Sequence, residues 1–549
     1  MLLKAYSHLS VRKKLGCIIA LGCVVRLIFF KGLTFFDGLP YTFYSYRLSA
    51  GAPLLAQDAF GLRLGLILPT ALSLRILGFN QFALVLFPFL CSLAGIYLAF
   101  RVGKHFADAE TGLLAALLMC FFPLDVMFSS MLYPDSPLAF FLPLSFFLWY
   151  RGQSEKRPLF GLLSGLLVGY SYLLRMTALF ICFPMAICSV VLKRFFSKCN
   201  VLLLAGLLAV MVSEISYYYW QTGNPVYRFS LASRTLALAD THLRRSLREA
   251  DEVGGSFWDG RGSVGFGVMR GKNWFVEPLW TLTTNQEFGL FYFFIVPAGI
   301  WCLFRRRRGT LILVIWAFAL LLYIFYGSTT PFTYRPLGRW PRYTSVVTIP
   351  AVVILSIFLR EKRKWLWSRF VHLTTLLLAA TSLGLLYIDP DNFEKKMIRR
   401  VASTIAHHED RSYLVSQETC WKILPFFRYS PPPNLAIVRP PVRLRAGGRR
   451  TPKQFWGVPF RDIQSSESYH LIVGPDEEGL VNTDGRPFEG KIERERNRLA
   501  PLAERLAIPQ TITTKIFPYG VFLIYAPKIQ TEDEQEHVCP CPFDVGRKQ

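Results

Sequence analysis

Apolar runs of about 18–20 residues, nearly free of charge, recur along the chain as far as residue 388. A run of this length crosses the hydrocarbon core of a bilayer as an α-helix. The runs predict transmembrane helices at about residues 15–31, 81–100, 111–129, 136–150, 158–174, 177–192, 200–220, 288–304, 309–326, 343–359 and 366–388. The pattern therefore predicts a polytopic α-helical membrane protein with about 11 transmembrane helices.

Clusters of lysine and arginine at the ends of these runs indicate which side of the membrane each end faces. Lys4, Arg12, Lys13 and Lys14 precede the first run and predict a cytoplasmic N-terminus. With this number of crossings, every later cluster also falls on the cytoplasmic side: Arg101 with Lys104, Arg151 with Lys156 and Arg157, Lys193 with Arg194 and Lys198, and the basic runs at 305–308 and 360–364. A miscounted helix would invert the later loops, so the charges support the count.

This topology predicts a membrane domain over residues 1–388, with long outer loops at 32–80 and 221–287. The first loop contains "GLRLGLILPTALSLRILG", which we expect to form a helix lying at the membrane interface. Residues 389–549 alternate strand-like stretches ("SYLVS", "NLAIV", "YHLIVG") with helical ones and include a predicted hairpin, "TITTKIFPYGVFLIYAP". They predict a soluble α/β domain on the periplasmic or extracellular side.

The formal net charge of +25 first suggests an anionic partner such as nucleic acid. The distribution of charge excludes that interpretation. From residue 389 onward there are about 24 basic and about 21 acidic side chains, which leaves about 38 basic against about 16 acidic in the membrane part. Most of the excess lies beside apolar runs, where it orients helices in the membrane. The predicted location is the bacterial plasma membrane, in contact with its lipids.

ATP chemistry is not indicated anywhere in the chain. The glycine-rich "GGSFWDGRGSVGFGVMRGKNW" lacks the ending of a phosphate-binding loop and lies in a predicted outer loop. The cytoplasmic loops are too short to hold a nucleotide-binding domain. Energy for a reaction outside the membrane must therefore arrive with the substrate, and a lipid-linked activated group is the natural carrier.

Carboxylates gather near the outer ends of the predicted helices. Asp37 lies in "FFDGLPYTFYSYRLSAG", just after the first helix, and Asp135 lies in "MLYPDSPLAFF", at the start of the fourth. Glu214, Glu287 and Asp125 lie at similar depths. An ionised group at membrane depth is costly unless paired or hydrated, so each is a functional candidate. The structural alternative is an interfacial acid paired with arginine, or, for Asp135, a helix cap.

Arginines occur at the same predicted level, against the positive-inside trend. Arg175 in "YLLRMTALF" is the clearest case. The others are Arg47, Arg228, Arg335, Arg339 and Arg342. Guanidinium groups bind phosphate through two hydrogen bonds and stay charged when desolvated. Carboxylates and arginines at one level suit a hydroxyl nucleophile and a lipid-phosphate leaving group, whereas mutual salt bridges remain the alternative for any single arginine.

Several stretches, in this order, resemble those of the C-type glycosyltransferase superfamily, and in particular the bacterial relatives of protein O-mannosyltransferases and aminoarabinose (lipid A) transferases. Besides the acid after the first helix, they are "LGFNQFA", "FFPLDVMFSSMLYPDSPLAFF", "GLLSGLLVGYSYLLRMTALF", "YYYWQTGNPVYRF", "EFGLFYFFIVPAGIW" and "RYTSVVTIPAVVIL". The resemblance covers about residues 10–360 and adds little for the tail.

This resemblance implies an inverting glycosyltransferase that uses a polyprenyl-phosphate sugar donor and a hydroxyl acceptor at the outer face. Asp37 would be the catalytic base. Asp135 would orient or assist, and Arg175 and Arg342 would hold the phosphate. The other expected substrate-binding residues are Tyr41, Tyr44 and Tyr46, which would stack on the sugar, together with Arg47, Glu214, Arg228 and Tyr343.

One departure from the family is visible. Gly38 follows Asp37 where many relatives carry a second acid, which weakens the placement of the base. Among relatives, the aminoarabinose branch binds zinc through glutamate and histidine, but His242 is the only histidine in the outer loops before the tail. We infer no metal or other cofactor, and dependence on a divalent metal stays open. A lipid or polysaccharide transporter and a polymer ligase remain the alternative functions, and the sequence names neither the sugar nor the acceptor.

Overall fold

The computed structural model describes residues 9–35, 37–233, 282–283, 288–305, 308–327, 341–361, 365–387, 398–399, 401–403, 405–407, 413–415, 417–438, 454–455, 458–461, 470–473, 512–517 and 520–525. The chain divides into two compact units, Met1–Asn392 and Phe393–Gln549. Each unit is described by itself.

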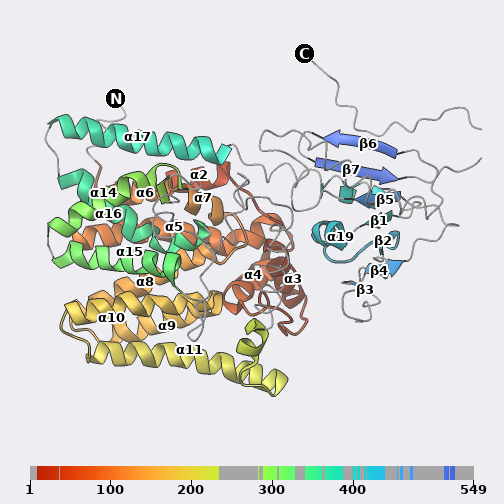
Figure 1. Ribbon diagram of the computed structural model, residues 1–549, viewed down its shortest axis with the longest axis horizontal. Helices are drawn as coiled ribbons and strands as arrows, with labels where there is room; N and C mark the ends of the chain where they lie inside the picture. Colours follow the sequence, from red (N-terminus) through yellow and green to blue (C-terminus); the bar gives the residue numbers. More distant parts are fainter. Residues whose placement is uncertain are drawn as a thin grey trace, which may run out of the picture. The chain divides into compact units, whose positions relative to one another are not determined.

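The first unit is built of α-helices, most of which run side by side, with α3 and α4 at one end of the bundle (Figure 1). Their bounds are α2 Val11–Ile28, α3 Gly38–Ser49, α4 Leu64–Leu77, α5 Gln81–Phe106, α6 Ala109–Cys120, α7 Pro123–Ser129, α8 Asp135–Ser154, α9 Leu159–Leu174, η1 Met176–Ile181, α10 Cys182–Val191, α11 Lys198–Thr222, α14 Phe291–Phe304, α15 Arg308–Tyr326, η3 Pro341–Val347, α16 Thr348–Glu361 and α17 Trp365–Tyr387.

Side-chain caps start several of these helices where the sequence provides them. Ser10, Asn80, Asp108 and Ser197 each accept a hydrogen bond from the backbone N–H three residues later. Each cap satisfies one of the backbone donors that a helix start leaves without an intrahelical partner. Gly223, in the left-handed region with φ 69°, ends α11.

Glycines let α9 and α11 pack closely. Gly161 and Gly165 stand one turn apart on α9, and a Cβ at Gly165 would lie only 2.0 Å from the carbonyl oxygen of Leu203. Gly206 makes a similar approach to α9 from the other side. Small residues one turn apart are typical of helix pairs in membranes, because they let the two backbones approach.

Each predicted transmembrane run coincides with a helix or a pair of helices in the structure. Among the described residues, four helices are long and apolar enough to cross a membrane by length and composition alone: Gln81–Phe106, Lys198–Thr222, Gly309–Tyr326 and Pro341–Arg360. The pair α6 and α7, bent by 61°, passes as a fifth if it is one broken span. The total of about 11 crossings stays a prediction.

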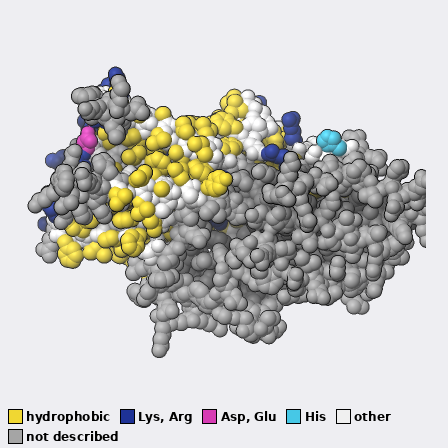
Figure 2. Space-filling view, turned by 90° about the horizontal axis from the view of Figure 1, so that it is seen from above, with side chains coloured by type: hydrophobic (Ala, Val, Ile, Leu, Met, Phe, Trp, Pro, Cys, Tyr) yellow, Lys and Arg dark blue, Asp and Glu magenta, His cyan; other side chains and the backbone are white. Residues whose placement is uncertain are grey.

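Apolar side chains dominate the described surface of the helical unit. Figure 2 shows them covering most of the visible, coloured face, with basic side chains toward its edges. Large exposed side chains include Leu72, Ile76, Val201 and Phe293. A contiguous apolar surface of this kind is what contact with lipid requires, since lipid tails make no hydrogen bonds.

The loop at 32–80, which is predicted to lie on the outer side, is more ordered than its sequence indicated. It contains the expected helix, α4, and a second one, α3, that the hydrophobic pattern did not predict. Tyr44, Leu54, Leu62 and Tyr218 belong to one buried apolar cluster that fastens this loop to the C-terminal part of α11. The loop is therefore a fixed part of the helical unit rather than a free connection.

The second unit contains a seven-stranded sheet in the order β3-β4-β2-β1-β5-β7-β6. Its described elements are β1 Tyr413–Val415, α19 Gln417–Ile423, η4 Leu424–Phe427, β2 Leu435–Val438, β3 Gln454–Phe455, β4 Val458–Arg461, β5 His470–Val473, β6 Ile512–Phe517 and β7 Gly520–Tyr525. β1 pairs in parallel with β2 and β5, whereas β6 and β7 form the predicted antiparallel hairpin. The strands predicted at "SYLVS", "NLAIV" and "YHLIVG" are β1, β2 and β5.

Candidate active site

Two short segments that follow helices α2 and α7 run side by side. The backbone N–H groups of Lys31 and Gly32 donate to the Oγ (3.0 Å) and carbonyl oxygen (2.8 Å) of Ser130. Gly32 forms a parallel β-bridge with Met131, and its φ of 69° suits glycine. Because both segments advance in the same direction, they bring the next acids of the sequence, Asp37 and Asp135, to the same region.

Asp37 stands at the N-cap position of α3, but its side chain makes no capping hydrogen bond. Its carboxylate instead pairs with the guanidinium of Arg342, at 2.8 Å between Oδ2 and Nη1. Arg342 comes from η3, far along the chain. The Asp37 side chain is 24% exposed and that of Arg342 is 20% exposed, so both remain within reach of a substrate.

Asp135 begins α8 and is fully buried. Both of its carboxylate oxygens accept from Arg175, at 2.9 Å from Nη1 and 3.3 Å from Nη2. Arg175 stands in extended backbone at the break between α9 and η1, which turns its side chain away from the helix it follows. A bidentate pair of this kind fixes the plane of the guanidinium group.

Aromatic rings connect the two ion pairs. The guanidinium carbon of Arg175 lies 4.5 Å from the centroid of the Tyr343 ring, and that of Arg342 lies 5.8 Å from the same centroid. Arg342 also lies 5.5 Å from the ring centroid of Tyr133. Ser345 donates to the carbonyl oxygen of Asp135 at 3.3 Å, which joins η3 to the start of α8. The site is therefore assembled from α3, α8, the α9 break and η3.

Arg63 is a further member of this cluster, and the sequence interpretation did not assign it to the site. Its guanidinium lies over the rings of Tyr41 and Phe60, and its buried Nη1 has no hydrogen-bond partner among the described residues. Burial and, next, the charge of Arg175 lower the pKa of Arg63 to about 10, against the opposing effect of Asp37 and others. Arg63 therefore keeps its positive charge at neutral pH.

A signal for Arg63 was present in the sequence. Arg63, like Arg175, lies on the predicted outer side, against the positive-inside trend. It lies in the stretch "GLRLGLILPTALSLRILG", which the sequence predicts to form an interfacial helix. Together the cluster holds three guanidinium groups, of Arg63, Arg175 and Arg342, against the two carboxylates of Asp37 and Asp135. The excess of positive charge suits an anionic ligand such as phosphate.

The tyrosines of the loop at 32–80 lie differently from the expectation that they stack on a sugar. Tyr41 is fully buried beneath Arg63, and Tyr44 is buried in the apolar cluster that fastens the loop. Tyr46 packs edge-on against Phe79. In this structure the rings of Tyr41 and Tyr44 are buried and present no open face for stacking, and their role in substrate binding stays a prediction.

Arg47 lies at the opposite end of α3 from Asp37, about 15 Å along the helix axis. Its guanidinium lies over the ring of Phe43. Asp37, Arg175 and Arg342 lie near the N-terminal end of α3. Arg47 lies near the C-terminal end of that helix, so the structure does not bring it to them. The structure places Arg47 in the last turn of α3, a helix that the hydrophobic pattern did not reveal, and its contact with substrate stays a prediction.

Glu214 and Arg228 form a separate buried pair. Arg228 also donates to the carbonyl oxygens of Leu62 (3.3 Å) and Tyr172 (2.9 Å), and its guanidinium lies over the Tyr172 ring. These contacts hold Nη1 and Nη2 of Arg228 within the fold, so the pair braces the loop before Arg63 against α9 and α11. The structural alternative fits both residues better than substrate contact.

Three other acids and bases that the sequence singled out, Glu287, Arg335 and Arg339, lie outside the described residues. Within the described part of the chain, no three side chains of His, Cys, Asp or Glu are grouped as metal ligands. Both carboxylates of the cluster are occupied by arginines.

Comparison with known proteins identifies what this architecture is similar to. Residues 67–220 match the family model of dolichyl-phosphate-mannose-protein mannosyltransferase. ArnT from Cupriavidus metallidurans, solved in the apo state and bound to undecaprenyl phosphate, is 13% identical with a TM-score of 0.60, covering 92% of this chain and 97% of ArnT. The oligosaccharyltransferase from Archaeoglobus fulgidus is 11% identical, with a TM-score of 0.47, covering 75% of this chain and 63% of that one. No curated protein matches in sequence.

The family-model match and the fold shared with ArnT confirm the resemblance to the C-type glycosyltransferase superfamily, in a form similar to protein mannosyltransferases and ArnT. The apolar helices and the shared fold also indicate a multi-pass membrane protein. The orientation of the chain in the membrane stays a prediction.

Proposed function

We propose that this protein transfers a sugar from a polyprenyl-phosphate donor to a hydroxyl acceptor at the outer face of the membrane, with inversion at the anomeric carbon. The observation that carries the proposal is the meeting of Asp37 with Arg342 beside the Asp135–Arg175 pair and Arg63. The match to a mannosyltransferase family and the ArnT structure with undecaprenyl phosphate support a lipid-phosphate donor.

Exposure separates the roles of the two acids. Asp37 is partly exposed, so its carboxylate can take the proton of an acceptor hydroxyl as that oxygen attacks the sugar. Asp135 is fully buried, and both of its oxygens are bound by Arg175. Asp135 therefore serves as the residue that holds Arg175 in place rather than as a second base.

The charge balance of the site suits the leaving group. In the reaction the bond from the anomeric carbon to a phosphate oxygen breaks, and a bond from that carbon to the acceptor oxygen forms. A phosphodiester with one negative charge becomes a phosphomonoester with a second, while a proton moves to Asp37. Arg63, Arg175 and Arg342 supply preorganised positive charge where this negative charge develops.

The competing functions make different products. A lipid or polysaccharide transporter would move its cargo without breaking a glycosidic bond, and transporters more often place ionisable residues near the midplane. A polymer ligase would join a preformed glycan to its acceptor instead of a single sugar. The described cluster does not distinguish a hexose from a pentose, or a lipid acceptor from a glycan or a protein.

The test is transfer by purified protein from a panel of polyprenyl-phosphate sugars to hydroxyl acceptors, comparing wild type with Asp37→Asn. The matched control is Asp58→Asn in the same outer loop, because an asparagine oxygen can still accept from the N–H groups of Phe60 and Gly61 as Asp58 does. We expect turnover by wild type and Asp58→Asn, and its loss in Asp37→Asn. If Asp37→Asn transferred the sugar at the wild-type rate, Asp37 would not be the catalytic base.

A further inference from the structure

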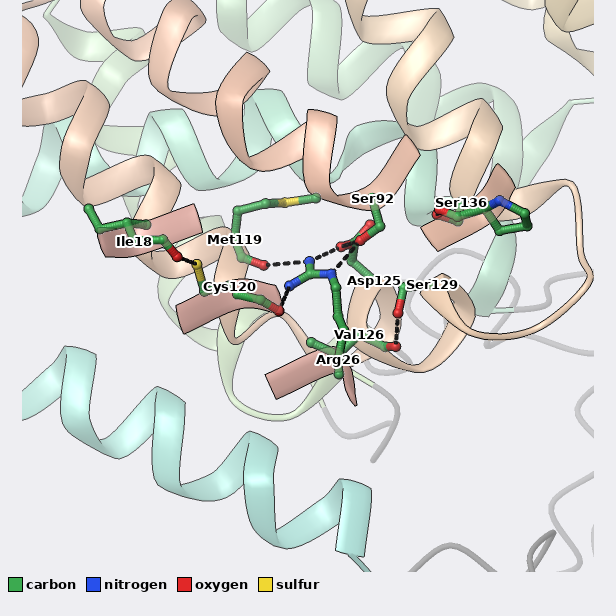
Figure 3. A network of polar contacts seen from close by, with 11 residues as sticks. Ile18, Arg26, Ser92, Met119, Cys120, Asp125, Val126, Ser129 and Ser136 are labelled. Atoms are coloured by element: carbon green, nitrogen blue, oxygen red, sulfur yellow. Dashed lines mark hydrogen bonds and ion pairs between the residues drawn. The ribbon is translucent and has the colours of Figure 1, made fainter. Parts of the chain in front are cut away.

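A second charged network is buried away from the cluster described above. Arg26 of α2 is fully buried, and it pairs with Asp125 of α7, which is 3% exposed. Ser92 of α5 completes a triangle: it accepts from Nε of Arg26 at 2.6 Å and donates to Asp125 at 2.5 Å. Figure 3 shows the guanidinium of Arg26 enclosed by these partners. The network joins three helices.

Backbone carbonyl oxygens accept further hydrogen bonds from both terminal nitrogens of Arg26. Nη1 donates to the carbonyl oxygen of Gly22 at 3.0 Å, and Nη2 donates to that of Met119 at 3.5 Å. Gly22 keeps the space clear, since a Cβ there would lie 2.4 Å from Ile96 and 3.2 Å from Nη1. The packing around Arg26 is thus shaped to hold a guanidinium group in one orientation.

A buried ion pair is an inefficient way to stabilise a fold. Desolvation of the two charges offsets much of their attraction, and an apolar pair of similar volume is often equally stable. The free-energy cost of burying a charged group is greater at membrane depth. A pair such as Arg26–Asp125 is therefore better explained by the geometry it imposes, which fixes α2 against α7 in one register.

Both partners lead directly to the acids of the candidate active site. Beyond Arg26 the chain leaves α2 and passes Lys31 and Gly32 before it reaches Asp37. Beyond Asp125 it leaves α7 and passes Ser130 and Met131 before Asp135. The two segments are joined by the Ser130 hydrogen bonds and the Gly32–Met131 bridge. Farther along, Tyr133 donates to the carbonyl oxygen of Phe35 at 3.3 Å.

At one end, the two paired segments are joined by the Arg26–Asp125 ion pair. At the other end, the carboxylates of Asp37 and Asp135 both stabilise the positive charge of Arg342. Asp125 lies on α7, which is bent by 61° from α6, and it pairs there with Arg26 of α2. A shift of α2 relative to α7 would displace both segments, and with them Asp37 and Asp135.

We infer that Arg26 and Asp125 are positioning residues, which set the distance between Asp37 and Asp135 without touching the substrate. This inference rests on the proposed function, because it assigns the pair a purpose in that reaction. A displacement on the order of 1 Å in a reacting group costs on the order of 100-fold in rate. Loss of the pair should therefore lower kcat and leave donor binding by the three arginines of the site nearly unchanged.

The experiment compares Asp125→Asn and the double variant Arg26→Met/Asp125→Leu with wild type. The double variant leaves no unpaired charge, so it is expected to fold even if the single variant does not. Binding of polyprenyl phosphate gives the number of competent sites, and kcat is expressed per competent site. We expect a loss of kcat on the order of 100-fold per site, with the Kd for polyprenyl phosphate changed less than about threefold.

Gln153→Leu is the matched control, because Gln153 is equally buried and hydrogen-bonded to Ser197 and Asn200 at the other end of α8. It should lower stability without lowering kcat per competent site. A second readout does not depend on catalysis: amide hydrogen exchange at Lys31 and Gly32 should accelerate in both Asp125 variants and not in Gln153→Leu.

The outcomes separate this inference from the proposed function. Absence of sugar transfer by wild type would overturn the function, and hydrogen exchange would still report on the coupling between the segments. Transfer by wild type with unchanged kcat per site in the double variant would overturn the positioning role alone. Unchanged amide hydrogen exchange at Lys31 and Gly32 in the double variant would also overturn the positioning role.

Discussion

The carboxylate of Asp37 and the guanidinium of Arg342 lie 2.8 Å apart, although they come from the loop at 32–80 and from η3, about 300 residues later in the chain. This contact makes one site out of segments that the sequence separates. It also means that the proposed base and a proposed phosphate ligand restrain each other. Changing either residue should therefore alter both donor affinity and turnover.

Asp37→Asn should slow transfer strongly while strengthening donor binding. Loss of the general base is expected to lower kcat by on the order of 100- to 10,000-fold. Loss of the carboxylate charge releases Arg342 from its ion pair, so the Kd for polyprenyl phosphate should fall. Equilibrium binding of the lipid and steady-state transfer, measured on the same preparation, test the two effects together.

Asp37→Glu provides the control for that prediction, since it keeps the charge and moves the carboxylate. It should retain donor affinity near the wild-type value and recover part of the turnover. Weaker donor binding by Asp37→Asn would contradict the arrangement, because it would mean that the carboxylate helps to bind the lipid.

Arg63→Met should weaken donor binding without unfolding the protein. The Arg63 guanidinium is not part of any ion pair within the described residues, and its Nη1 lacks a hydrogen-bond partner there. Removing one phosphate ligand is expected to raise the Kd for polyprenyl phosphate about tenfold or more. The melting temperature should stay the same or rise. A normal Kd would exclude Arg63 from the phosphate site.

The lowered pKa of Arg63 gives a pH signature. Burial brings the pKa to about 10, so the side chain is protonated at neutral pH and loses its charge as the pH rises through that value. Donor affinity attributable to Arg63 should then be constant from about pH 7 to 9 and decline above it. Binding measured from about pH 8 to about pH 11 should show this decline in wild type and a smaller one in Arg63→Met.

The linkage to stability has the opposite sign. Because folding lowers the pKa of Arg63 from its ordinary value to about 10, the unfolded chain binds more protons than the folded one between these two pKa values. This group's contribution to the free energy of unfolding therefore increases as the pH rises through that range. The decline in donor affinity at high pH thus does not follow from Arg63 destabilising the fold.

Hydrophobic periodicity predicted the helices well because each run of apolar residues reports directly on burial in lipid or in the bundle. It missed α3, whose residues Pro40, Tyr41, Tyr44 and Arg47 show no clear period and carry no side-chain cap. That helix depends on contacts with distant segments, such as the packing of Tyr44 with Tyr218 in one cluster. A local pattern contains no information about such partners.

The site was predictable in its types of residue and not in its pairing. Charge against the positive-inside trend identified Arg175, and depth identified Asp37 and Asp135. Nothing local could show that Arg342 faces Asp37. The same signals also selected Glu214 and Arg228, which satisfy each other elsewhere. A charged residue at membrane depth can be identified from the sequence, but only the fold shows whether its partner is another side chain.

The glycine contacts between α9 and α11 should be needed for folding. A Cβ at Gly165 would lie 2.0 Å from the carbonyl oxygen of Leu203, which is backbone and cannot move alone. Gly165→Ala is therefore expected to lower the free energy of unfolding by about 1–3 kcal/mol. Gly16→Ala is the control, because nothing lies within 4 Å of a Cβ there. Equal melting temperatures for the two variants would contradict the close approach.

The buried pair Asp135–Arg175 should separate stability from activity. Arg175→Met leaves the fully buried carboxylate of Asp135 without its bidentate partner, which is expected to cost about 3–5 kcal/mol in the free energy of unfolding. Asp135→Leu/Arg175→Met removes both charges and should recover most of that loss. Transfer should not recover, because the phosphate ligand is still missing. Melting temperature and kcat/KM measured on all three proteins decide the matter. If activity returned with stability in the double variant, the pair would be only a structural support, and the phosphate would be held by Arg63 and Arg342.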